Sequence, residues 1–536
     1  MKIVFTLVLL INSLIFSNDK NDVISEEIRR RVEDLNAGIK VEIQGQMLFC
    51  AKLLPEFYGQ RSFEPAWSNE KNSREFISQL IKANEVGLSP FDYHYKLITD
   101  FSKNVRSPEE HAELDMLITD AYLLYASHLL NGKVNPETID SEWKAVRREG
   151  NPVSILQKAI SNKNVSKSLD DLEQTNTSYQ GLKEALKEYQ NVLDNGSWIV
   201  LPDGPTLKPG ITDSIRVPLL IKRLIISGDL NFEPEDRISF TEAIAQSLRK
   251  YQKRNGLEID GNLGKLTTES LNISVENRID QIKVNLERYR WIFHDLGEQY
   301  VFVNIAGFQM QVVENEQVVL QEKVIVGKPF RKTPVFSSKM TYLVLNPYWT
   351  VPPTILYNDI IPEVKKNVGY LSLKNIRVIQ GYGSETKEID PSTIDWNKYS
   401  QGKFPYTLRQ DPGVINALGV VKFIFPNNYS VYIHDTPSKE LFNRPERTFS
   451  SGCIRLNNPM SLVNYLLSDE TGLNQEKINN MLSLGKEKTI MLKKPINVHI
   501  QYLTCWFDGE SLQFRNDVYS RDKPVLQALN ESPSSL

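Results

Sequence analysis

The spacing of hydrophobic residues changes once along the chain, and this change limits the fold more than any other feature. Over residues 21–200, apolar side chains recur every three or four positions, as in "AELDMLITDAYLLYASHLLNGK", and this period is typical of amphipathic helices. From about residue 299 the period becomes two, as in "QYVFVNIAGFQMQVVENEQVVLQEKVIVG", which indicates strands. The sequence therefore predicts an α+β protein whose helices come first and whose strands come last.

The length of 536 residues exceeds what one hydrophobic core usually holds, so we expect two to four domains. A stretch rich in proline and glycine, residues 201–217, is typical of a linker. The patterns on either side predict a helical domain over residues 21–205, a small unit of three short helices over residues 211–275, and a mainly β domain over residues 295–536.

Residues 361–410 interrupt the β pattern. They are rich in turn residues and keep no sustained period. A disordered segment would contain few aromatic residues, whereas this one holds Trp396, Tyr399, Phe404 and Tyr406. We therefore predict a packed insertion or lid within the β domain.

The N-terminus has the pattern of an export signal. Lys2 is followed by a mostly apolar run from Ile3 to Phe16, which is shorter than the ~20 residues that a membrane-spanning helix needs. We expect residues 1–17 to be a signal peptide that directs the protein to the periplasm. Because the residues before Ser17 are large, an uncleaved inner-membrane anchor stays open, and so does a buried first helix.

Charge and composition exclude several functions. The formal net charge of −3 gives no reason to expect a nucleic-acid partner, because such proteins concentrate positive charge. The six histidines are scattered and the cysteines show no ligand spacing, so we expect neither a metal site nor a cofactor. The cysteine count is odd: Cys50 could pair with Cys505 and leave Cys453 alone, or all three could be free.

Cys453 stands in a setting that suits a nucleophile. A cysteine reacts as its thiolate and is usually activated by a histidine within hydrogen-bond reach. His434 ends the run "SVYIH", nineteen residues (453 − 434) before Cys453, so the two side chains could meet across neighbouring strands. Ser451 and Gly452 suit a tight turn whose backbone N–H groups, with that of Cys453, could form an oxyanion hole.

Arg455 lies two residues beyond Cys453 and shares its face if the segment is extended. There it could bind a substrate carboxylate through two hydrogen bonds and help to stabilise a thiolate. Each residue also has an ordinary interpretation: Cys453 as a small buried apolar residue, His434 as a strand-end histidine bonded to backbone, and Arg455 as part of a surface ion pair.

The segment "HDTPSKELFNRPERTFSSGCIRLNNP" (434–459) resembles the signature of the L,D-transpeptidase catalytic domain of the YkuD type. In that signature a histidine precedes a Ser/Thr-x-Gly-Cys segment, which an apolar residue and Arg or Asn follow. Many members have a second histidine before the glycine, where this chain has Ser451. The Ser-Ser-Gly-Cys form is similar to the large multidomain YcbB-type branch, and it leaves His434 as the only candidate base.

The resemblance covers most of the chain in the expected order. It implies a helical scaffold domain, a small three-helix peptidoglycan-binding domain 1 module, and a mainly β catalytic domain with a cap over residues 361–410. The segments that carry it, besides the signature, are residues 83–94 and 130–140 for the scaffold, 220–272 for the module, and 346–356, 404–427 and 502–519 for the catalytic domain.

The resemblance implies a peptidoglycan L,D-transpeptidase. The cysteine would attack the carbonyl of the third stem residue, meso-diaminopimelate, and release the terminal D-alanine. The amine of a second stem would then resolve the thioester and give a 3–3 crosslink. The implied site consists of Cys453 as nucleophile, His434 as base oriented by a backbone carbonyl near Asp435, and Tyr432, Ser451, Gly452, Arg455 and Trp349 around the substrate, where Trp349 could equally be a core aromatic.

The implied partners are peptidoglycan stem peptides, together with penicillin-binding proteins and carboxypeptidases that supply them. The resemblance also implies a monomer that uses no cofactor. Two alternatives stay open: an L,D-carboxypeptidase that uses water as acceptor, and a non-catalytic wall-binding protein in which Cys453 is vestigial.

Overall fold

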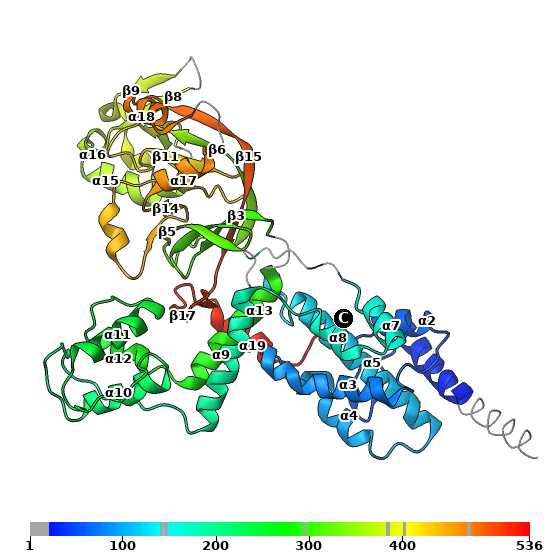
Figure 1. The fold of residues 1–536 in the computed structure, drawn as a ribbon. Coiled ribbons are helices and arrows are strands. Elements are labelled where there is room, and N and C mark those ends of the chain that lie inside the picture. The colour runs from blue at the N-terminus through cyan, green and yellow to red at the C-terminus, as the bar shows by residue number, and fades with distance from the viewer. Residues whose placement is uncertain are drawn as a thin grey trace, which may run out of the picture.

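The computed structural model describes residues 21–139, 143, 148, 150–292, 296–381, 386–399, 404–468 and 473–536. The expected signal peptide, residues 1–17, lies outside them. The described chain forms a helical lobe, a smaller three-helix module and a β domain (Figure 1), and this confirms the predicted α+β architecture. Within these residues, no helix combines the length and the apolar character that crossing a membrane requires.

The helical lobe is built around α5 (Pro108–Asn131), which is buried over most of its length. A capping box starts this helix: the Ser107 hydroxyl accepts from the Glu110 N–H, and the Glu110 carboxylate accepts from the Ser107 N–H. The lobe also contains residues 21–36, α2 (Leu53–Gly59), α3 (Glu70–Ile81), α4 (Tyr95–Phe101), α6 (Pro136–Ile139), α7 (Pro152–Asn162), α8 (Val165–Asp170), α9 (Thr177–Asp194), the 3₁₀ turns Lys82–Val86 and Pro90–Tyr93, and the hairpin of β1 (Glu42–Ile43) and β2 (Gln46–Met47).

The three-helix module consists of α10 (Arg216–Ile226), α11 (Glu242–Arg254) and α12 (Lys265–Leu271) around its own hydrophobic core. Its packing begins before residue 211. Leu201 and Leu207 are buried in that core, and the backbone of Leu207 pairs with that of Leu263. The proline- and glycine-rich stretch is therefore not wholly a free linker, because its leucines supply apolar surface that so small a unit needs.

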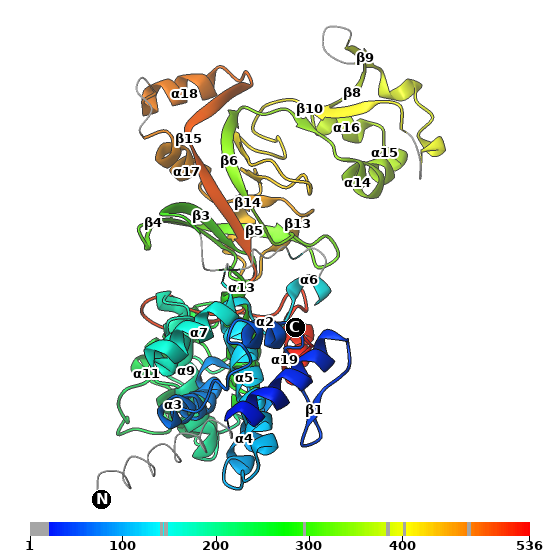
Figure 2. The ribbon, with the colours of Figure 1, turned by 90° about the vertical axis from the view of Figure 1, so that its right-hand side faces the viewer.

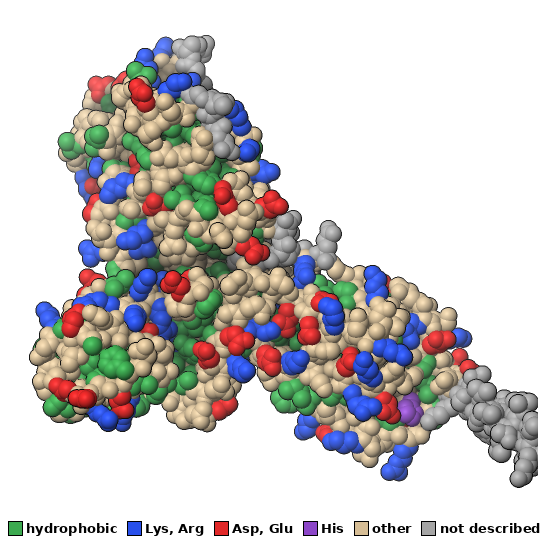
Figure 3. All heavy atoms as spheres, viewed as in Figure 1, with side chains coloured by type: hydrophobic (Ala, Val, Ile, Leu, Met, Phe, Trp, Pro, Cys, Tyr) green, Lys and Arg blue, Asp and Glu red, His purple; other side chains and the backbone are tan. Residues whose placement is uncertain are grey.

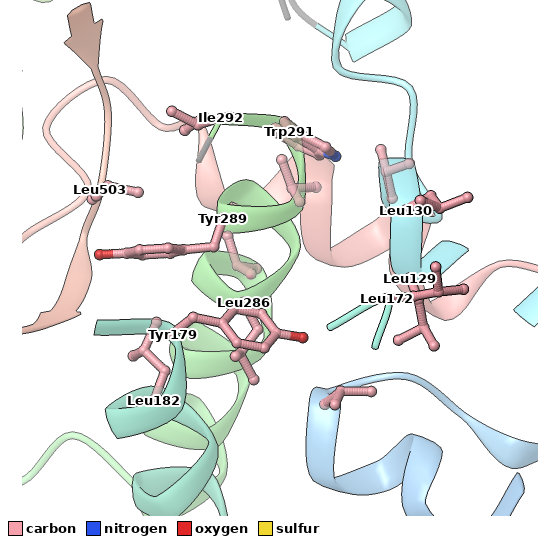
Figure 4. Close-up of a cluster of buried hydrophobic side chains, with 14 of the residues drawn as sticks. Leu129, Leu130, Leu172, Tyr179, Leu182, Leu286, Tyr289, Trp291, Ile292 and Leu503 are labelled. Atoms are coloured by element: carbon pink, nitrogen blue, oxygen red, sulfur yellow. The ribbon is translucent and has the colours of Figure 1, made fainter. Parts of the chain in front are cut away.

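A long helix, α13 (Val275–Ile292), leads from the module to the β domain and packs against α9. Figure 4 shows Leu286 and Tyr289 of α13 facing Tyr179 and Leu182 of α9. The C-terminal helix α19 (Asp522–Asn530) joins this bundle through an ion pair of 2.6 Å between Arg288 Nη1 and Asp522 Oδ1. The end of the chain thus returns to the helical region.

Nine strands form the main sheet of the β domain in the order β13-β5-β14-β12-β11-β6-β15-β3-β4, and β4 also pairs with β5. This extra pairing closes the sheet on itself. The strands are β3 (Gln299–Asn304), β4 (Gln309–Glu314), β5 (Gln317–Gly327), β6 (Phe336–Leu345), β11 (Val421–Ile424), β12 (Ile433–His434), β13 (Thr448–Ser450), β14 (Ile454–Leu456) and β15 (Lys488–Gln501), and a separate hairpin joins β16 (Cys505–Phe507) to β17 (Leu512–Phe514).

Side chains of the closed sheet alternate between its inside and its outside. Phe423 and Ile433 are direct partners on β11 and β12, and both are fully buried in the core. Their neighbours Lys422 and His434 are also direct partners and point to the other face. The β domain further holds α17 (Pro459–Leu466) and α18 (Gln475–Ser483).

The start of α17 departs in part from the pattern of its sequence. Pro459 occupies the first turn, where proline is favoured because it lacks the N–H that would be unpaired there. Asparagine is favoured at an N-cap, yet the side chain of Asn458, which stands at this position, makes no capping hydrogen bond.

The insertion is a folded subdomain with its own hydrophobic core and sheet, and it extends to one side of the β domain (Figure 2). It starts at Trp349, earlier than residue 361, and its aromatic residues pack together, as Trp396 does against Phe404. Its elements are β7 (Trp349–Thr350), α14 (Pro353–Ile355), a π-helical turn (Leu356–Ile360), α15 (Ile361–Lys366), α16 (Gly369–Leu373), β8 (Ile376–Gln380), β9 (Lys387–Ile389), two 3₁₀ turns (Pro391–Thr393 and Trp396–Lys398) and β10 (Thr407–Gln410).

Charged side chains of both signs are interspersed over the face that Figure 3 shows. This mixture fits the formal net charge of −3.

Candidate active site

The residues that the sequence singles out meet on two neighbouring strands. β12 and β14 pair in parallel, and His434 lies directly opposite Arg455. The Ile454 N–H donates to the Tyr432 carbonyl at 3.1 Å, so the pairing continues toward Cys453. Because side chains alternate along a strand, Tyr432, His434, Cys453 and Arg455 share one face.

A turn formed by residues 450–453 holds the cysteine. Gly452 has a φ of +116°, a conformation that side-chain-bearing residues rarely adopt. The Ser450 hydroxyl donates to the Cys453 carbonyl at 2.6 Å and accepts from the Gly452 N–H at 3.1 Å. Ser450 was not predicted from the sequence, although serine before a glycine is typical of such side-chain-stabilised turns.

The two backbone N–H groups of the predicted oxyanion hole differ in whether they already donate a hydrogen bond. The Gly452 N–H is already bonded to the Ser450 hydroxyl, so it is occupied in this conformation. Among the described residues, none accepts a hydrogen bond from the Cys453 N–H. The Cys453 amide is therefore the donor that a substrate oxygen could use first.

His434 is held in one orientation by backbone. Its Nδ1 lies 2.5 Å from the Asp435 carbonyl. Because a carbonyl only accepts, Nδ1 carries the proton and Nε2 keeps its lone pair. The Asp435 carboxylate is used elsewhere: it accepts from the Val420 N–H at 2.9 Å and from Lys439 Nζ at 2.6 Å. The structure thus has the backbone acceptor that the resemblance implies, rather than the aspartate side chain.

Burial sets the protonation of both groups. It lowers the pKa of His434 to about 3, and the nearby positive charge of Arg455 acts in the same direction. Burial also raises the pKa of the Cys453 thiol, while hydrogen bonds from Tyr432 and the charge of Arg455 lower it only in part. At neutral pH the site therefore holds a neutral imidazole and a thiol.

Cys453 is partly exposed, and its Sγ lies 3.9 Å from the Ser430 carbonyl. Among the hydrogen bonds of the described residues, none joins this Sγ to His434. Catalytic contacts are often long before substrate binds, so this geometry is compatible with later proton transfer from the thiol to the imidazole.

Arg455 is a half-buried cation that lacks a partner among the described residues. Its Nε makes no hydrogen bond, and burial lowers its pKa. A buried charge without a partner is costly, so this position favours an anionic ligand. A substrate carboxylate would satisfy it.

Ser451 connects the turn to the insertion. Arg331 Nη1, in the loop after β5, donates to the Ser451 hydroxyl at 2.9 Å. The same guanidinium forms an ion pair of 2.6 Å with Asp359, which belongs to the π-helical turn of the insertion. Neither residue was predicted from the sequence, because both lie about a hundred residues from the motif and only the fold brings them to it.

The two aromatic residues differ in their positions. Tyr432 packs against the hydrophobic core of the insertion, and its ring centre lies 5.6 Å from that of His434. Trp349 is a member of that core and is 9% exposed. This placement favours its interpretation as a core aromatic.

The remaining predicted features can also be placed. Cys50 and Cys505 are both buried and free, so the open alternative of a disulfide between them does not occur. The described part of the chain contains no group of three or more His, Cys, Asp or Glu side chains that could hold a metal ion.

Family models match two parts of the chain. A scaffold domain matches residues 52–186, and an L,D-transpeptidase catalytic domain of the YkuD family matches residues 298–477, which include His434 and Cys453. A curated Haemophilus influenzae protein, provisionally named an L,D-transpeptidase, is 33% identical over 255 residues. These residues are 47% of this chain and 50% of that protein, so the chain spans about half the length of this relative.

Solved structures of L,D-transpeptidases also align with the chain. One from Mycobacterium smegmatis covers 38% of this chain and 58% of that chain at 13% identity, with a TM-score of 0.19. One from Stackebrandtia nassauensis covers 56% of this chain and 97% of that chain at 14% identity, with a TM-score of 0.21. These TM-scores are too low to add support. In this chain, a domain that matches the YkuD L,D-transpeptidase catalytic family follows a domain that matches a scaffold family.

Proposed function

We propose that this protein is a peptidoglycan L,D-transpeptidase that forms 3–3 crosslinks through a thioester on Cys453. The observation that carries the proposal is the parallel pairing of β12 with β14, which puts His434, Cys453 and Arg455 on one face. The hydrogen bond from His434 Nδ1 to the Asp435 carbonyl supports the proposal, because it leaves Nε2 to accept a proton.

The proposed reaction begins with a neutral pair. His434 Nε2 takes the thiol proton while Cys453 Sγ attacks the carbonyl of the third stem residue. The carbonyl becomes an oxyanion, which the Cys453 N–H stabilises. When the intermediate collapses, the bond to the terminal D-alanine breaks, and the imidazolium gives its proton to the leaving amine.

The second half transfers the acyl group. The side-chain amine of a second stem attacks the thioester carbonyl and loses a proton to His434. The bond between carbon and sulfur then breaks, and the proton returns to Cys453. Atoms balance without a cofactor: one peptide bond is broken, one is formed, and one D-alanine is released.

Substrate positioning falls to the residues around the cysteine. Arg455 would bind a carboxylate of the donor stem, because its half-buried guanidinium lacks a counter-charge among the described residues. Tyr432 would form a wall of the site under the insertion, and Ser451 would link that wall to the Arg331–Asp359 pair. A peptidoglycan substrate requires a location outside the cytoplasm, and we infer that the protein works in the periplasm.

Purified tetrapeptide-stem muropeptides test the proposal. The protein is incubated with them under reducing conditions, and the products are identified by mass spectrometry. We expect both free D-alanine and 3–3 dimers from the wild-type protein, and neither from Cys453→Ser. Release of D-alanine without dimers would instead identify an L,D-carboxypeptidase, and the absence of both products would refute an enzymatic function on these stems.

A further inference from the structure

A concave site lies between the β domain and the helical lobe. It is a cleft of about 250 Å³, below the ~300 Å³ at which sites for drug-sized ligands begin. One wall is the outward face of β3 and β4, where Tyr300, Phe302, Gln309 and Gln311 line it. The opposite wall comes from the start of α9 and from the β16–β17 hairpin, including Trp506.

The chemistry of the lining points to a neutral, hydroxyl-rich ligand. Aromatic rings offer flat apolar faces, and carboxamides offer both donors and acceptors. Among the described residues, the Gln309 side chain has no hydrogen-bond partner, whereas Gln311 Nε2 donates to Gln321 Oε1 at 2.9 Å. The described lining residues include two carboxylates, Glu316 and Asp508, which can accept from hydroxyl groups, and no lysine or arginine. A phosphate or carboxylate ligand would find no counter-charge there, while a sugar ring could stack on the rings and bond to the amides.

The register of the sheet relates this cleft to the candidate active site. Gln309 lies opposite Lys323 of β5, and Arg455 lies opposite Ile325 of the same strand. Continuing that register by two residues puts Cys453 opposite Gly327. The path from Gln309 to Cys453 therefore runs four residues along β5 and crosses one strand spacing on each side of it. This gives a separation of about 16 Å.

The face of the sheet is also shared. Met310 and Val312 of β4 are fully buried in the core, so Gln309 and Gln311 point outward, as His434 does. A stem peptide extended at ~3.4 Å per residue covers about 10 Å to its third residue, and the linkage to its sugar adds to that reach. The extended stem and the linkage to its sugar would together have to span the about 16 Å between Gln309 and Cys453.

We propose that this cleft binds a neutral acetamido sugar of the glycan strand and thereby presents the attached stem to Cys453. The identity of the polymer rests on the proposed function, whereas sugar binding can be measured without any turnover. The cleft would select glycan-borne stems, because a free peptide makes no contact there.

Binding of stem-free glycan tests the cleft directly. The probes are glycan strands whose stems an amidase has removed, and triacetylchitotriose, and the full chain is titrated by calorimetry. We expect Gln309→Leu and Tyr300→Ala each to weaken binding about tenfold, which corresponds to one lost hydrogen bond or stacking contact. Gln299→Leu is the matched control, because Gln299 precedes Tyr300 on β3, points the other way and does not line the cleft.

All variants retain the three-helix module, so any sugar affinity of that module cancels in the comparison. Equal affinity of Gln309→Leu, Tyr300→Ala and Gln299→Leu would overturn the proposal, and so would a wild-type protein that binds neither probe. Thermal melting confirms that each variant folds.

Activity separates this proposal from the proposed function. With a sugar-free tetrapeptide donor, Gln309→Leu should match the wild-type rate, while on intact sacculi it should be slower. The wild-type protein could release no D-alanine and still bind glycan more tightly than Gln309→Leu does. That result would refute the proposed reaction and support glycan binding in the cleft.

Discussion

His434 and Arg455 are direct partners across the parallel pair of β12 and β14. Burial and the guanidinium together lower the pKa of His434 to about 3. The imidazole is therefore neutral at physiological pH and can act as a base as soon as the thiol donates to it. Before substrate binds, the site therefore holds a neutral thiol and imidazole instead of a thiolate and imidazolium ion pair.

The first prediction concerns the reactivity of Cys453. Because burial raises the pKa of its thiol, alkylation by iodoacetamide should be slow at pH 7 and should accelerate with a midpoint above the ~8.5 of a free thiol. The rate is followed by peptide mass spectrometry, which separates Cys453 from the buried Cys50 and Cys505. A midpoint below pH 7 would indicate a preformed ion pair and contradict this assignment.

The second prediction concerns covalent inhibition. A carbapenem should add its mass to the wild-type protein through Cys453, and Cys453→Ser should show no adduct. Cys50→Ser is the matched control, since Cys50 is buried in the helical lobe and should leave the adduct unchanged. A persistent mass shift in Cys453→Ser would rule out this cysteine as the nucleophile.

The third prediction concerns Arg455. Arg455→Gln removes the half-buried cation that lacks a partner among the described residues, so the donor stem should lose a charge-assisted hydrogen bond. We expect kcat/KM to fall about 10- to 100-fold, mainly through KM. A donor whose carboxylates are amidated should already be poor for the wild-type protein and change little on Arg455→Gln. An equal loss with both donors would show that Arg455 acts on folding rather than on a carboxylate.

The fourth prediction concerns Ser450, which fixes the turn through the Cys453 carbonyl and the Gly452 N–H. Ser450→Ala should lower the free energy of unfolding by about 1–2 kcal/mol, because it leaves a part-buried carbonyl without its donor. The rate of carbapenem acylation should also fall. Ser483→Ala, on the exposed side of α18, removes a comparable serine and should change neither quantity. Unaltered acylation in Ser450→Ala would exclude a positioning role.

The fifth prediction concerns the ion pair between Arg331 and Asp359. Asp359→Asn removes the charge that ties the insertion to the loop after β5, so amide exchange in residues 353–366 should increase. A partly exposed pair contributes about 0.2–1 kcal/mol, which limits the increase to roughly fivefold. Asp395→Asn breaks a pair with Lys398 inside the insertion and should not affect residues 353–366. Slower amide exchange of residues 353–366 in Asp359→Asn would contradict a stabilising role of the ion pair between Arg331 and Asp359.

Local patterns predicted much of the fold and of the site. The change of period separated the helices from the strands, and the spacing of His434 and Cys453 allowed the two residues to lie on neighbouring strands, as the pairing of β12 with β14 shows. Arg331 and Asp359 could not be predicted, because their meeting with Ser451 depends on how the insertion folds back. The cleft beside Gln309 was missed for a similar reason, since its walls come from segments almost two hundred residues apart.

The pairing of β4 with β5 also affects how the protein behaves in a crowded compartment. Open sheet edges carry unpaired N–H and C=O groups that recruit strands from other molecules. Here the longest strands are paired on both sides, and β13, a strand of three residues, is left at the margin of the main sheet. Such a short margin offers few positions for strand addition, so the closed sheet itself guards the domain against edge-to-edge aggregation.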